Sequence, residues 1–257
     1  MKRYHFISGL PRSGSTLLTS ILNQNPKFYS NISNPLARFV RAVITESHAG
    51  PGYALQCPEP KRFELVQNLI ETYHSHVPAE VCFNTNRGWT ALLSVLDQTS
   101  PDAKVICCVR DIRWVLDSFE QLFKKNPFSL SRMYSEQEAE TVYSRAYASM
   151  SPGHTVRFAY DCLKEAITGP HKHKIMLVEY ENLARNPDTT MRAIYSFIGE
   201  PYYAHDFNSV EATYDEYDAE AGITGLHTIR KKIEFVPRNP ILPPDLWNEF
   251  ANLEVWR

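Results

Sequence analysis

The segment YHFISGLPRSGSTLLTSILNQ, residues 4–24, restricts the fold of this chain more than any other stretch. Its strand-like run YHFIS ends at Gly9, and STLLTSILNQ (15–24) has a helical pattern that stops at Asn25-Pro26. A glycine-containing turn between a strand and a helix directs backbone N–H groups and the positive end of the helix dipole at an anion. The segment therefore predicts a strand–loop–helix unit that binds a phosphate-like group.

The loop matches the Walker A pattern G-x-x-x-x-G-K-[ST] except at its lysine. Gly9 and Gly14 have the required spacing and Thr16 matches the final hydroxyl, but Ser15 stands at the lysine position. The nearby cation is Arg12, three residues earlier. Three side chains add hydroxyl donors: Ser13, Ser15 and Thr16. A phosphate loop is favoured, with a plain strand-to-helix turn as the alternative.

The rest of the chain alternates helical and strand-like patterns. Helices are expected over 35–48, 61–76, 89–98, 111–125 and 189–198, strands over 80–84, 104–109 and 173–180, and a loop over 49–60. The continuous apolar run KVICCV (104–109) is typical of a strand buried on both faces. This alternation predicts an α/β fold with a central parallel sheet flanked by helices, P-loop-like at its first strand. With no break in composition, residues 1–257 are expected to form a single domain.

The composition argues against several classes of protein. A net charge of −2 gives no overall attraction to nucleic acid or to anionic membranes. No stretch approaches the roughly 20 apolar residues of a membrane span, and the first apolar run is too short for a signal peptide. The five cysteines lack metal-ligand spacing. We therefore expect a cytoplasmic protein without a metal site or a nucleic-acid partner.

A second motif, RDIRWVLDS (110–118), follows the buried strand KVICCV. Arg110 would leave the sheet at its carboxyl edge, and Ser118 would lie about two helical turns further on. A salt bridge to a neighbouring aspartate is the alternative role for Arg110. A rival interpretation makes VICCVRD a Walker B strand with Asp111 on magnesium, but it accounts for neither Arg110 nor the absent loop lysine.

The string GLPRSGSTLL resembles the 5′-phosphosulfate loop of sulfotransferases that use PAPS (3′-phosphoadenosine 5′-phosphosulfate). The tyrosylprotein sulfotransferases, with their PRSGTTL-type loops, are the most similar. The resemblance implies that Arg12 contacts the phosphosulfate and that the rest of the loop cradles it, through Ser13, Gly14, Ser15 and Thr16. It also implies that Arg110 and Ser118, which have the family's spacing, bind the 3′-phosphate.

Two further segments extend this resemblance. VEYENLARNPDTTMRAIYSFIGEP (178–201) resembles a family segment whose tyrosine lies near the adenine, which assigns that role to Tyr180; a core aromatic is the alternative. IRKKI (229–233) resembles the basic segment that closes over the 3′-phosphate in cytosolic sulfotransferases. Arg230 and Lys231 would make those contacts, unless the run is simply a solvated surface.

The catalytic groups match less well. In-line sulfuryl transfer to a hydroxyl needs positive charge around the sulfuryl oxygens and a base for the proton. The family's glutamate would fall in NISNP (31–35), which has no carboxylate, and Thr85 stands where a lysine is expected. Arg87 is the candidate replacement for that lysine. His48 is the candidate base, with Glu46 or an acidic acceptor that needs no base as alternatives.

The predicted function is transfer of a sulfuryl group from PAPS to the hydroxyl of a small molecule or peptide, with PAP (3′,5′-adenosine bisphosphate) as product. A P-loop kinase or NTPase is a second interpretation, disfavoured by Ser15. A non-catalytic adenine-nucleotide-binding protein is a third, if the missing glutamate and lysine have no replacements.

Overall fold

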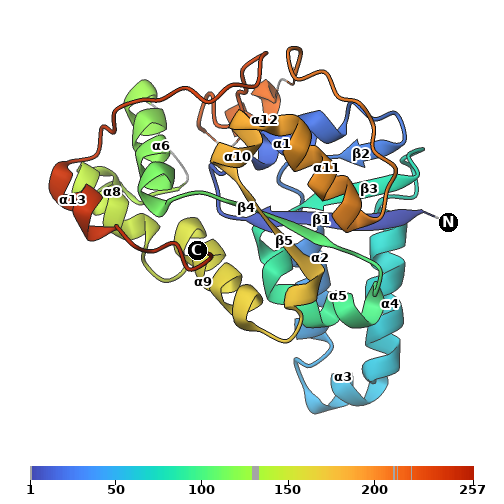
Figure 1. The fold of residues 1–257 in the computed structure, drawn as a ribbon. Helices are drawn as coiled ribbons and strands as arrows, with labels where there is room; N and C mark the ends of the chain where they lie inside the picture. Colours follow the sequence, from blue (N-terminus) through green and yellow to red (C-terminus); the bar gives the residue numbers. More distant parts are fainter. Residues whose placement is uncertain (1, 129–132, 211, 213, 221) are drawn as a thin grey trace.

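The computed structural model describes residues 2–128, 133–210, 212, 214–220 and 222–257. Its centre is one five-stranded parallel sheet in the order β2-β3-β1-β4-β5 (Figure 1). The strands are β1 (Arg3–Gly9), β2 (Phe28–Ser30), β3 (Val81–Thr85), β4 (Val105–Val109) and β5 (Ile175–Glu179). The α/β fold with a central parallel sheet is therefore confirmed, and β2 is a short strand that the sequence patterns did not predict.

The strand order determines where a ligand site can form. After β1 the chain moves toward β2 and β3, whereas after β4 it moves the other way, toward β5. In open α/β sheets the crevice beyond the carboxyl ends of two such strands is the usual binding position. Gly9 of β1 is in register with Cys108 of β4, so the segments that follow the two strands start side by side.

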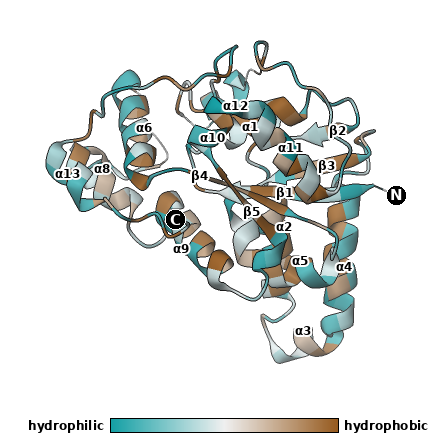
Figure 2. Ribbon diagram, viewed as in Figure 1, coloured by the Kyte–Doolittle hydropathy of each residue, from teal (hydrophilic) through white to brown (hydrophobic). Residues whose placement is uncertain are grey.

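Helices cover both faces of the sheet, as predicted. On one face, Ile7, Ile106 and Cys108 pack with apolar residues of α1 (Ser15–Leu22), α10 (Tyr180–Arg185) and α11 (Pro187–Ile198). On the other, Phe6 and Cys107 pack with α2, α4, α5, α6 and α9. These are α2 (Leu36–Glu46), α4 (Glu59–Tyr73), α5 (Leu93–Thr99), α6 (Ile112–Lys125) and α9 (Thr155–Thr168). Figure 2 shows the strands and the inward faces of the helices as the most apolar parts of the ribbon.

Several helices lie where the sequence patterns gave none. The expected loop over 49–60 is wrong, because α3 (Pro51–Gln56) forms there with Pro51 in its first turn, where a missing N–H is tolerated. Between α6 and β5 lie α7 (Glu136–Ala139) and α8 (Val142–Ser149), each opened by a capping box, as well as α9. Short 3₁₀ helices cover Arg87–Leu92 and Lys172–Lys174.

The described residues of 205–257, here named the C-terminal strap, cross the carboxyl edge of the sheet and pass beside α6 and α8 (Figure 1). The chain then ends at Arg257, which pairs with Glu179 of β5. The strap contains α12 (Asp215–Glu220) and α13 (Pro244–Glu249). It is fixed to α6 at Asp117, which is fully buried and accepts hydrogen bonds from the backbone N–H groups of Ile241 and Leu242. The strap also reaches the segment that follows β1, where the carbonyl oxygen of Leu226 accepts a hydrogen bond from Arg12.

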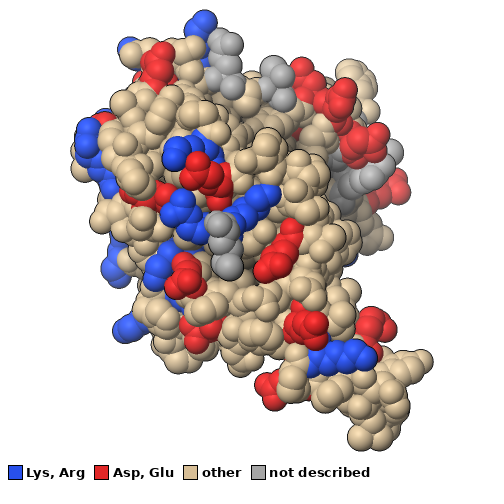
Figure 3. All heavy atoms as spheres, turned by 90° about the vertical axis from the view of Figure 1, so that its right-hand side faces the viewer, with Lys and Arg blue, Asp and Glu red and all other residues tan. Residues whose placement is uncertain are grey.

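On the face seen in Figure 3, acidic and basic side chains lie beside one another near the centre, and other residues cover most of the remaining surface. Within the described residues, no helix is long and apolar enough to cross a membrane. The same residues contain no group of three or more His, Cys, Asp or Glu side chains arranged to hold a metal ion.

Candidate functional site

The loop after β1 has the geometry of an anion cradle. Gly9 has a φ of +92°, and a Cβ built there would lie 2.2 Å from the carbonyl oxygen of Cys108, so only glycine fits. Gly14, with a φ of +91°, begins α1, and no side chain caps this helix. The first N–H groups of α1, including those of Ser15 and Thr16, have no acceptor within the helix. They are left free for an anion.

Arg12 connects the loop to two distant parts of the chain. Its Nε donates to Oγ of Ser118 at 3.0 Å, and its Nη1 donates to the carbonyl oxygen of Leu226 in the strap. Its backbone is left-handed, with a φ of 58°. Burial, followed by the charge of Arg110, lowers the pKa of Arg12 to about 10, which still leaves the guanidinium protonated at neutral pH.

Arg110 stands at the end of β4, as predicted, and is mostly buried. Its guanidinium lies 4.3 Å from the ring centre of Tyr180, and its Nε is 3.5 Å from a carboxylate oxygen of Glu181. Asp111, the residue that a Walker B interpretation needs, accepts hydrogen bonds from the backbone and side chain of Arg113. The two predicted phosphate motifs therefore meet, because Ser118 and Arg110 both lie against Arg12.

Arg87, which follows β3, also contacts the loop. Its Nη2 donates to Oγ of Ser15 at 2.9 Å. Its Nη1 is buried and has no hydrogen-bond partner among the described residues. Burial lowers the pKa of this guanidinium, and the neighbouring thiols of Cys108 and Cys107 raise it. A cation with an unpartnered buried donor, directed at a serine of the loop, fits the role of the absent lysine.

Three other predicted donor-binding residues, Ser13, Thr16 and Tyr180, lie in or against the loop. Ser13 is buried and its Oγ donates to the carbonyl oxygen of Pro11 at 3.3 Å, whereas Thr16 is partly exposed on the first turn of α1. Tyr180 begins α10 and lies across the loop, since a Cβ on Gly14 would come within 3.0 Å of its ring. Tyr180 is therefore next to both the loop and Arg110, and the adenine contact that the family resemblance implies for it stays a prediction.

Arg230 and Lys231 are exposed, and their role at the 3′-phosphate stays a prediction. The carbonyl oxygen of Lys231 accepts a hydrogen bond from Val210, which ties this basic run to the first part of the strap. A different strap residue, Arg238, lies 4.6 Å from the ring of Trp114, which also faces Arg110 at 5.9 Å. Nothing in the sequence around Arg238 distinguishes it from the other surface arginines, so the analysis of motifs missed it.

His48 and Glu46 are exposed near the far end of α2. That end is about 15 Å along the axis from Leu36, where the helix begins. Nδ1 of His48 is 2.8 Å from the carbonyl oxygen of Ile44, one turn back on the same helix. The structure therefore brings His48 into contact with none of the loop residues, and its role as base stays a prediction.

The arrangement combines free helix N–H groups, three arginines and several hydroxyls at one crevice. Nη1 of Arg87 is buried and has no hydrogen-bond acceptor in the described part of the chain, whereas Nε of Arg110 faces a carboxylate oxygen of Glu181 at 3.5 Å. Buried polar groups of this kind are costly unless something satisfies them. An anion bound at the loop would satisfy Nη1 of Arg87, so the residues present fit a ligand that carries a phosphate-like group.

Known proteins were compared with this chain. The profile described as "Sulfotransferase family" matches residues 5–204. The sulfotransferase domain from the curacin biosynthetic pathway has a TM-score of 0.54 at 15% identity, covering 99% of this chain and 92% of that one. A sulfotransferase from Alicyclobacillus acidocaldarius has a TM-score of 0.52 at 18% identity, covering 86% and 91%. At these identities the structures show a shared fold, and comparison with curated protein sequences gave no match. The profile match spans most of the chain and includes both phosphate motifs, and the protein therefore belongs to the sulfotransferase family.

Proposed function

We propose that this sulfotransferase takes its sulfuryl group from PAPS and transfers it in line to the hydroxyl of a small-molecule or peptide acceptor, releasing PAP. The observation that carries the proposal is the contact between Arg12 and Ser118, whose Nε and Oγ atoms are 3.0 Å apart. These residues belong to two motifs more than 100 positions apart, and each motif by itself suits a phosphate group.

Donor binding would use both ends of the crevice. The loop residues Gly14, Ser15 and Thr16 and the free N–H groups of α1 would hold the 5′-phosphosulfate, and Arg110 with Ser118 the 3′-phosphate. Tyr180 would lie against the adenine. The contacts with Ser118 and Leu226 use Nε and Nη1 of Arg12, so Nη2 would be the nitrogen that binds a ligand oxygen while both contacts are kept.

Transfer would rely on fixed positive charge. As the bond from sulfur to the 5′-phosphate oxygen breaks, negative charge would grow on that phosphate, and Arg12 would stabilise it. Arg87, already directed at Ser15, would contact the sulfuryl oxygens. Charges that are fixed before the reaction and partly shielded from water are effective in this role.

A thermal-shift screen tests donor choice. Wild-type protein is heated with PAP, AMP, ADP and ATP, each with and without magnesium, and a ligand that binds the folded state raises Tm by mass action. PAP is expected to give the largest shift, independent of magnesium. A larger shift with ATP and magnesium would favour a P-loop kinase or NTPase instead.

Two wider expectations belong to the same proposal. One is that residues 1–257 act as a single domain, which limited proteolysis would test by yielding no stable fragment. The other is a cytoplasmic location, which fractionation of cells producing the protein would test.

A further inference from the structure

A buried pair, Asp218 and His227, lies outside every motif that the sequence singled out. Nδ1 of His227 is 2.6 Å from one carboxylate oxygen of Asp218, and the backbone N–H of His227 donates to the other at 3.0 Å. The side chains are only 3% and 11% exposed, respectively. Two hydrogen bonds to one carboxylate fix both the position and the orientation of the imidazole.

This pair lies beside the phosphate loop. Leu226, the residue before His227, accepts a hydrogen bond from Arg12 through its carbonyl oxygen. The ring of Tyr217 packs edge-on against His227 at 4.9 Å and is near enough to Arg87 to influence its pKa. The charged and titratable groups that face His227 are Asp218, Tyr214 and Tyr217 from the strap, Arg12 from the loop and Arg87 from the segment after β3.

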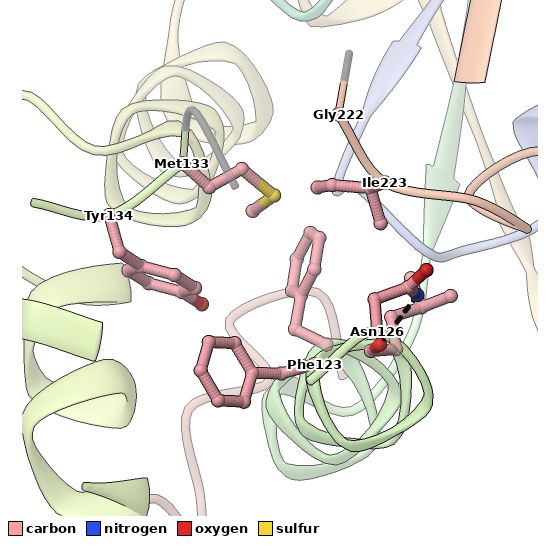
Figure 4. Close-up of a pocket in the computed structure, with 8 residues that line it drawn as sticks. Phe123, Asn126, Met133, Tyr134, Gly222 and Ile223 are labelled. Carbon is pink, nitrogen blue, oxygen red and sulfur yellow. Dashed lines mark hydrogen bonds between the residues drawn. The ribbon is translucent and has the colours of Figure 1, made fainter. Parts of the chain in front are cut away.

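The strap segment that carries His227 also contacts α6 and the residue that follows it. Ile223 fills part of an apolar pocket with Phe123 and Met133, as Figure 4 shows. Next to it, Nδ2 of Asn126 donates to the carbonyl oxygen of Thr224 at 3.1 Å. The backbone N–H of Ile223 donates to the carbonyl oxygen of Asp218, which closes the short connection between the two members of the pair.

The hydrogen bond to Asp218 determines which ring nitrogen is basic. When a carboxylate accepts the proton on Nδ1, the lone pair of the neutral imidazole is on Nε2. Nε2 of His227 has no hydrogen bond to any described residue. Burial lowers the pKa of His227, Asp218 raises it, and the charges of Arg12 and Arg87 lower it. A pKa below the ordinary value keeps the ring neutral near pH 7, so it is able to accept a proton.

We propose that His227 is the general base of the reaction and that Asp218 is its positioning residue. In the transfer step the acceptor oxygen forms a bond to sulfur while its proton passes to Nε2 of His227. The bond from sulfur to the 5′-phosphate oxygen breaks and its electron pair stays on PAP. The imidazolium then releases its proton to water. This inference rests on the proposed PAPS-dependent function and supplies the base that NISNP lacks.

An NMR titration tests the pair without any acceptor. The ring signals of His227 are followed against pH in wild type and in Asp218→Asn. The wild-type pKa should lie below the usual value of about 6.5. Removal of the carboxylate charge should lower it further, because Asp218 stabilises the imidazolium. An unchanged pKa in Asp218→Asn would overturn the pairing.

Kinetics test the catalytic role. The kcat/KM is measured from pH 5 to 9 with PAPS and the best acceptor among 2-naphthol, 4-nitrophenol and benzyl alcohol. Wild-type activity should fall on the acid side as His227 becomes protonated. His227→Ala should lower kcat/KM on the order of 10²–10⁴-fold. It should also lose the fall in activity on the acid side, here named the acid limb. Asp218→Asn should move that limb to lower pH. His173→Ala, which removes an exposed histidine near the start of β5, is the matched control.

PAP binding separates the two proposals. His227→Ala should bind PAP about as well as wild type, because its defect is in proton transfer. If wild type uses PAPS and His227→Ala keeps the full rate and the acid limb, the inference fails and the proposed function stands. Loss of the limb in His48→Ala alone would likewise overturn it. If wild type neither binds PAP nor uses PAPS, the proposed function fails, and this inference fails with it.

Discussion

The two sides of the crevice are built in different ways. The sheet side consists of short connections directly after β1, β3 and β4, and it supplies Arg12, Arg87 and Arg110. The strap side is a long segment with two short helices, and it supplies Asp218, His227 and Arg238. Under the two proposals above, the comparison gives a division of tasks: cations at the sheet edge would hold the donor, and the strap would cover it and take the proton.

Substitution of one glycine on each side compares how tightly the sheet side and the strap side are packed. We expect the largest effect on folding at Gly9. Gly9→Ala puts a Cβ 2.2 Å from a backbone oxygen of β4, so we expect little folded protein. Gly225→Ala in the strap meets no atom closer than 3.8 Å, although its φ is +85°. It should cost about 1–2 kcal/mol, the usual penalty for a left-handed non-glycine residue. Circular dichroism and thermal melts measure both, and a stable, folded Gly9→Ala would contradict tight packing on the sheet side.

Arg12 tests the task of the sheet side. If it stabilises charge that develops on the leaving phosphate, Arg12→Ala should lower kcat by roughly 10²–10³-fold and raise the KM for PAPS less. Arg12→Lys should keep part of the activity, because the charge remains while the two-pronged geometry is lost. Steady-state kinetics with varied PAPS decide the matter, and unchanged turnover in Arg12→Ala would remove this residue from the chemistry.

Arg238 tests whether the strap also helps to hold the donor. Its guanidinium lies 4.6 Å from the ring centre of Trp114, the ring that Arg110 also approaches, but the buried carboxylate of Asp117 already pairs with it. We therefore expect Arg238→Ala to weaken PAP binding only several-fold, with AMP binding little changed. The double variant Arg230→Ala/Lys231→Ala serves as the comparison. A larger loss of PAP affinity in that double variant would indicate that Arg230 and Lys231, rather than Arg238, contact the 3′-phosphate.

The sequence predicted the sheet side far better than the strap side, for a physical reason. Buried parallel strands such as KVICCV have a strong apolar signature, and the residues that follow them must emerge at one edge. Arg12 and Arg110 could therefore be placed together from the sequence. The contact between His227 and Asp218 depends on the path of an irregular segment of the strap. Such a segment has no periodic apolar pattern from which its path could be predicted. His48, chosen because it followed the expected position of the base, lies at the exposed end of its helix.

The predicted helices show the same limit. The apolar face of α6 was read correctly because Ile112, Val115 and Phe119 recur at helical spacing and are buried. The short α3 was not predicted because its Pro51-Gly52 pair is typical of loops and none of its residues is buried. A helix that buries no apolar face leaves no periodic pattern in the sequence, so its prediction depends on local composition alone.

The most direct test of the donor site is the affinity for PAP relative to AMP in wild type and in Arg110→Ala, by titration calorimetry. Arg192→Ala is the control, because Arg192 pairs with Asp188 on the exposed surface of α11. A charge-assisted contact to a phosphate contributes about 1.5–3 kcal/mol. Wild type and the control should therefore bind PAP at least about tenfold more tightly than AMP, and Arg110→Ala should lose most of that preference. An Arg110→Ala protein that keeps the full preference, or a wild type that has none, would contradict a 3′-phosphate site at this crevice.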